Sequence, residues 1–108
     1  MIGKAEINPG ICGFYARVIA TSQDMMHVQL QIESDCEQIQ EMGRELTQVS
    51  AFEEIFRQVG ETTICKQASR HKLHAACPVP VGILKAIEVA AELALPADVH
   101  ITITQENT

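Results

Sequence analysis

The chain has 108 residues, a formal net charge of −6 and a hydrophobic content of 46%. This length and composition predict one domain, residues 1–108, with a modest hydrophobic core. The eight basic residues are scattered and there is no tryptophan. A nucleic-acid partner is therefore not expected, because phosphate binding requires clustered Lys and Arg.

The hydropathy pattern indicates neither a targeting segment nor a membrane span. The stretch MIGKAEINPG contains no apolar run of signal-peptide length. The longest apolar stretch, 79–95, is interrupted by Lys85, Glu88 and Glu92, so no membrane partner is expected. We expect a cytoplasmic protein, in which the four cysteines are thiols or metal ligands rather than structural disulfides.

Alternating apolar residues predict strands in the first third of the chain. Residues 4–7 are expected to form a short strand, and residues 14–22 and 26–33 a β-hairpin. Matching the apolar faces of the hairpin sets Ala16, Val18 and Ala20 opposite Ile32, Leu30 and Val28. Extending this register places Cys12 opposite Cys36 on the apolar face.

Helical periodicity predicts two helices in the middle of the chain. Ser34, followed by Glu37, resembles a capping box, so the first helix is expected to start near Cys36. Its apolar face would hold Ile39, Met42, Leu46 and Val49. The second helix would be capped by Ser50 and ended by Gly60, with an apolar face of Phe52, Ile55, Phe56 and Val59.

The remaining residues predict two more helices and a last strand. Thr62-Thr63 would cap a short helix that carries Cys65, and the major helix would follow Pro78-Val79-Pro80 and run to about Leu95. Residues 98–104, DVHITIT, alternate and predict a strand. The expected class is α+β: an antiparallel sheet, formed by the hairpin and edge strands, with helices packed on one face.

The cysteines gather near predicted helix starts. Cys36, Cys65 and Cys77 each lie at or next to one, where free N–H groups stabilise a thiolate and lower its pKa. Thiolates bind Zn²⁺ and iron–sulfur clusters, and His74 is a further candidate ligand close to Cys77. Each cysteine also fits a second interpretation, as a small buried apolar residue, and each histidine fits a solvated surface position.

Three segments together resemble a known arrangement. GICGF with Cys12, ESDCEQI with Cys36, and KLHAACPVPVGILKAIEVAA with His74 and Cys77 are similar to the ligand segments of NifU/IscU-type iron–sulfur scaffolds, over residues 10–93. Cys36, Cys65 and AACPVP also resemble the cysteine pattern of TSCPD domains. The sequence departs from the scaffold pattern at Phe14, where an acidic residue is usual.

This resemblance implies an IscU/NifU-like fold and a site that binds zinc or an iron–sulfur cluster. The implied ligands are Cys12, Cys36, Cys65 and Cys77, with His74 as a substitute for one of them. The first hypothesis is therefore a metal- or cluster-binding module.

Two alternatives remain open at this point. One is a regulatory or interaction domain with core cysteines, which would bind a protein partner or form a homodimer. The other is a thiol enzyme or redox switch, with Cys77 as nucleophile or a Cys12–Cys36 disulfide. The sequence contains no Cys-x-x-Cys motif and no Gly-rich nucleotide loop, which disfavours an enzyme.

Overall fold

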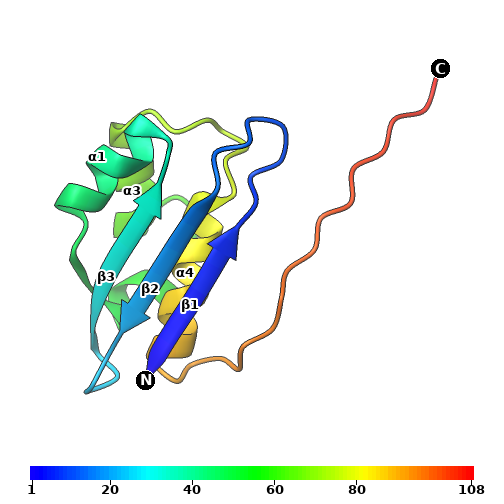
Figure 1. The fold of residues 1–108 in the computed structure, drawn as a ribbon. Helices are drawn as coiled ribbons and strands as arrows, with labels where there is room; N and C mark the ends of the chain where they lie inside the picture. Colours follow the sequence, from blue (N-terminus) through cyan, green and yellow to red (C-terminus); the bar gives the residue numbers. More distant parts are fainter.

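Alternating apolar and polar residues build a four-stranded antiparallel sheet with the order β1-β2-β3-β4. The computed structural model describes residues 1–108 and places the helices on one face of this sheet (Figure 1). The strands are β1 (Ile2–Ile7), β2 (Ala16–Thr21), β3 (His27–Ser34) and β4 (Gln48–Ser50). The helices are α1 (Glu37–Glu45), α2 (Ala51–Ile55), α3 (Thr63–Arg70) and α4 (Val79–Ala90). The predicted α+β class, with a helix-covered antiparallel sheet, is confirmed.

The β2–β3 hairpin keeps the predicted faces but not the predicted register. Ala16, Val18 and Ala20 are buried, as expected from the alternation. Val18, however, pairs with Ile32, and Ala20 pairs with Leu30, which is a shift of two residues from the predicted pairing. A shift of two leaves every side chain on its original face, so periodicity cannot detect it.

The loop between β2 and β3 decides this register. Asp24 Oδ1 accepts hydrogen bonds from the backbone N–H groups of Met26 and His27, at 2.9 and 2.8 Å, and Met25 adopts a positive φ of 64°. These bonds form a closed turn. His27 then pairs with Ser50 of β4 rather than with β2. The His27 ring and the two backbone N–H groups hold the pKa of Asp24 well below its ordinary value.

Helix α1 starts where predicted, next to Cys36, but it ends earlier, at Glu45. Cys36 is the N-cap residue, and Ser34 Oγ accepts its backbone N–H at 3.1 Å, so the expected capping box does not form. Ile39, Met42 and Leu46 are buried as predicted. Val49 is also buried, but it belongs to β4, a three-residue strand too short to show a period.

The predicted apolar face of the second helix is wrong except at Ile55, which packs half-buried against the core. Phe52, Phe56 and Val59 are exposed, and the helix has a single turn that ends at Ile55. The buried side is formed by Ala51 and Glu54. The Glu54 carboxylate accepts hydrogen bonds from the N–H groups of Thr63 and Ile64, at 2.9 and 2.7 Å. These two bonds hold the Ala51–Glu54 side of the helix toward the core.

The first turn of α3 is therefore capped twice. Thr62 Oγ1 accepts the Cys65 N–H at 3.0 Å, as the sequence predicts, and Glu54 satisfies the two preceding N–H groups. Glu54 is 1% exposed, so these bonds are shielded from water.

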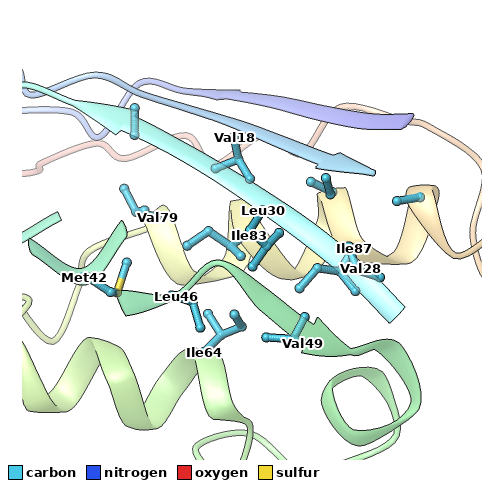
Figure 2. Packing of buried hydrophobic residues seen from close by; sticks show 14 of the residues in the cluster. Val18, Val28, Leu30, Met42, Leu46, Val49, Ile64, Val79, Ile83 and Ile87 are labelled. Atoms are coloured by element: carbon cyan, nitrogen blue, oxygen red, sulfur yellow. The ribbon is translucent and has the colours of Figure 1, made fainter. Parts of the chain in front are cut away.

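One hydrophobic core joins the sheet to all four helices. Figure 2 shows Val18, Val28 and Leu30 of the sheet opposite Ile83 and Ile87 of α4. Helix α4 lies against β1 at short range, because a Cβ atom on Gly3 would collide with the Ala86 carbonyl oxygen. A Cβ atom on Gly82 would likewise collide with the Ile7 side chain. The two contacts show that α4 runs antiparallel to β1.

The C-terminal region differs from prediction. Helix α4 ends at Ala90 rather than near Leu95, and its last turn is closed by the Leu93 N–H, which donates to the Glu88 carbonyl at 2.8 Å. The expected strand over residues 98–104 is wrong: the segment is exposed and extends away from the sheet without a neighbouring strand (Figure 1). None of the helices has the length and apolar character that a membrane span requires.

Replacing Glu54 with Ala is expected to lower the free energy of unfolding by about 3 kcal/mol, because two buried N–H groups lose their acceptor. Glu53→Ala is the matched control, since Glu53 lies in the same helix and is exposed. It should change stability by less than about 0.5 kcal/mol. Urea unfolding of the three proteins measures both values, and equal effects of the two variants would contradict the assigned cap.

Candidate thiol site

Three cysteines from separate parts of the chain lie at one end of the sheet. Ile7, Ala16 and Ser34 form a row across that end, because Ile7 pairs with Ala16 and Ala16 with Ser34. Cys12 lies in the loop between the first two of these residues, and Cys36 follows the third. Figure 1 shows the β1–β2 loop, the start of α1 and the segment before α4 at this end.

The position of α4 places Cys77 at the same end of the sheet. Gly82, in the first half of α4, packs on Ile7 at the end of β1. The start of α4 therefore lies beside the β1–β2 loop, and Cys77 comes just before that start. The expectation that Cys12 and Cys36 are direct partners across the hairpin is wrong, since Cys12 lies in a loop outside the strands and the register is shifted. Both nevertheless lie at the same end of the sheet as Cys77.

The three thiols have different surroundings. Cys12 is exposed in the β1–β2 loop, next to the exposed side chains of Ile11 and Phe14. Cys36 and Cys77 are half-buried and pack against the hydrophobic core. The Cys36 thiol donates to Gln38 Oε1 at 3.2 Å. Two of the three thiols, those of Cys36 and Cys77, are therefore held against the core, and the Cys12 thiol lies on an exposed loop.

Cys77 is placed by a tight turn. Its backbone N–H donates to the His74 carbonyl at 3.0 Å, which closes the turn His74–Cys77. His74 is exposed at the other end of this turn. The intervening residues, Ala75 and Ala76, complete this turn, so that His74 and Cys77 lie close along the backbone.

The electrostatics of the site differ from the prediction. Burial raises the pKa of the Cys77 thiol, a hydrogen bond from the Val79 N–H opposes that rise, and the Cys12 and Cys36 thiols add to it by mutual repulsion. The expected lowering by the helix N-terminus is therefore wrong for Cys77, because desolvation outweighs the Val79 bond.

The remaining predicted cysteine ligand, Cys65, is not brought into this group. Cys65 is half-buried in the first turn of α3, and it is not among the groups that act on Cys77. His71 Nε2 lies 3.1 Å from Glu45 Oε2 and joins the ends of α1 and α3. No three side chains of His, Cys, Asp or Glu converge at the distances of a formed metal site.

The sequence did not reveal the part played by Ser34. Its hydroxyl donates to the Tyr15 carbonyl at 2.8 Å and accepts the Cys36 N–H at 3.1 Å. It therefore ties the end of the Cys12 loop to the start of α1. A serine two residues before a helix cysteine is equally typical of a capping residue, so the pattern alone could not separate the two roles.

The fold and this cluster define a small α+β protein with three thiols gathered at one end of its sheet. The chain belongs to the family of unknown function DUF6951, whose model matches residues 3–103. No curated protein and no solved structure matches the chain.

The raised pKa of Cys77 predicts a stability change at alkaline pH. The folded chain holds this proton to a higher pH than the unfolded chain, whose thiol has its ordinary pKa of about 9.0. The stabilisation is therefore complete below pH 9.0 and is lost as the pH rises through the folded value. Unfolding free energies measured across alkaline pH should fall less steeply for Cys77→Ser than for the parent.

Cys65→Ser is the matched control, because it changes a half-buried thiol outside the cluster. It should keep the parent's pH dependence. Equal slopes for the parent and Cys77→Ser would refute the raised pKa.

Proposed function

We propose that the protein is a metal- or iron–sulfur-binding module in which Cys12, Cys36 and Cys77 are the protein ligands. The observation that carries this proposal is the approach of three thiols from separate loops and helix starts at one end of the sheet. A cysteine used only for packing would be buried, whereas Cys12 is exposed and the other two are only half-buried.

The donor set suits thiophilic metals. Three thiolates and one imidazole are a complete tetrahedral set for Zn²⁺, and thiolates likewise hold iron–sulfur clusters. His74 is the fourth candidate, because the turn to Cys77 keeps it nearby. The similarity to NifU/IscU-type scaffolds, which rests on the segments around Cys12, Cys36 and Cys77, supports the same set of ligands.

The open arrangement favours loading and release over a closed structural site. Two thiols are fixed at helix starts, and the third lies on an exposed loop, so binding would require that loop to move toward the other two. The raised pKa of Cys77 means that metal must displace a proton there. Affinity is therefore expected to rise with pH.

Cys12→Ser, Cys36→Ser and Cys77→Ser are each expected to lower affinity for Co²⁺ or Zn²⁺ by more than about tenfold, because each removes a direct ligand. The measurement is an anaerobic titration that follows thiolate-to-cobalt absorbance and competition by Zn²⁺. Cys65→Ser is the control and should bind like the parent. A parent that binds neither ion, or a loss confined to Cys65→Ser, would contradict the proposed site.

The metal and sulfide content of protein purified without oxygen distinguishes a bound zinc ion from an iron–sulfur cluster. Zinc without acid-labile sulfide would identify a zinc site, and iron with sulfide a cluster site. His74→Ala then tests the fourth ligand, with His71→Ala as control because His71 is paired with Glu45.

A further inference from the structure

Two parts of the molecule that lack a neighbouring strand on one side are complementary in length and in apolar pattern. The first is the outer edge of β1, which lies at the end of the strand order and pairs only with β2. The second is the segment 98–104, which alternates like a strand yet extends away from the sheet (Figure 1). Neither feature involves a cysteine.

The backbone of the β1 edge is regular along its whole length. Natural edge strands are usually protected by a proline, a bulge, a cover or charged side chains, and β1 carries charged side chains at Lys4 and Glu6. All six residues of β1 pair in continuous register with β2, so the strand has no bulge, and it contains no proline. Its backbone therefore presents a regular row of free donors and acceptors along one side.

The segment 98–104 has the pattern that this edge requires. Val99, Ile101 and Ile103 alternate with Asp98, His100, Thr102 and Thr104, and the three apolar residues are 56%, 76% and 87% exposed. Seven extended residues span roughly 23 Å, close to the roughly 20 Å of the six-residue β1. The match to the DUF6951 model extends to residue 103, so this segment belongs to the family sequence.

The faces also correspond. The side of β1 that faces the helices carries Gly3, Ala5 and Ile7, and its other side carries Lys4 and Glu6. A strand added beside β1 with Val99, Ile101 and Ile103 toward the helices would continue the apolar face. The same register would leave His100 and Thr102 on the polar face, beside Lys4 and Glu6.

We propose that segment 98–104 of one copy pairs with the β1 edge of a second copy, and that the exchange is reciprocal. Because α4 runs antiparallel to β1, the segment leaves α4 near the start of β1. Within one chain it would have to run parallel to β1, which is the weaker pairing, whereas a second copy can supply an antiparallel strand.

A reciprocal exchange also closes the assembly. Each β1 edge receives one segment, so the dimer has twofold symmetry and β1 is no longer an edge in either copy. The apolar residues of both segments become covered in the same step. The dimer does not depend on the thiol site proposed above.

Ile101→Asp tests this pairing, and Thr102→Asp is the matched control on the opposite face of the same segment. The probe is a second copy of the chain, and the readout is the dimer dissociation constant from sedimentation and light scattering across a dilution series. Ile101→Asp should raise that constant at least about thirtyfold. Thr102→Asp should remain dimeric, and circular dichroism should show that both variants keep the parent fold.

A mixture of copies with two different isotope labels identifies the partner strand. Filtered nuclear Overhauser effects between β1 of one copy and residues 98–104 of the other are expected. A dimer that Ile101→Asp leaves intact would overturn the proposal, because another surface would hold the copies together. A monomeric parent would also overturn it, and protected amides in 98–104 would then show that the segment pairs with its own β1.

Discussion

The close packing of α4 on β1 is the contact on which the rest of the structure depends. Gly3 lies against the backbone of Ala86 and Ala90, and Gly82 lies against Ile7, so small residues on both partners allow a short distance between helix and strand. Ile83 and Ile87 then extend into the core between the sheet and the other helices. A larger residue at Gly3 would push the helix away from the backbone it contacts.

This contact also positions both ends of α4. Its direction carries the start of the helix, with Cys77, to the end of the sheet where Cys12 and Cys36 lie. It carries the other end of the helix to the start of β1, where the segment with Ile101 departs. One packing constraint therefore places the thiol cluster and also sets the direction of the segment, so that pairing within one chain would be parallel, the slightly weaker arrangement.

The burial of Glu54 and the raised pKa of Cys77 both reflect the cost of removing charge from water. Glu54 is buried because two N–H groups of α3 need an acceptor, and this need outweighs the apolar pattern around Phe52. Cys77 is half-buried, and this burial raises the pKa of its thiol. Desolvation therefore explains both why the buried Glu54 of α2 needs the two N–H donors and why the pKa of Cys77 is raised.

The sequence by itself determined the fold class, both faces of the β2–β3 hairpin and the start of α3 at Thr62, because these depend on local periodicity and capping. It also singled out Cys12, Cys36 and Cys77. The periodicity could not decide the register, since a shift of two residues preserves every face, and the local turn at Asp24 distinguishes the alternatives. Tertiary structure decided that Glu54 rather than Phe52 faces the core, that Cys65 lies apart from the other three cysteines and that residues 98–104 have no neighbouring strand. Each of these depends on residues distant in sequence.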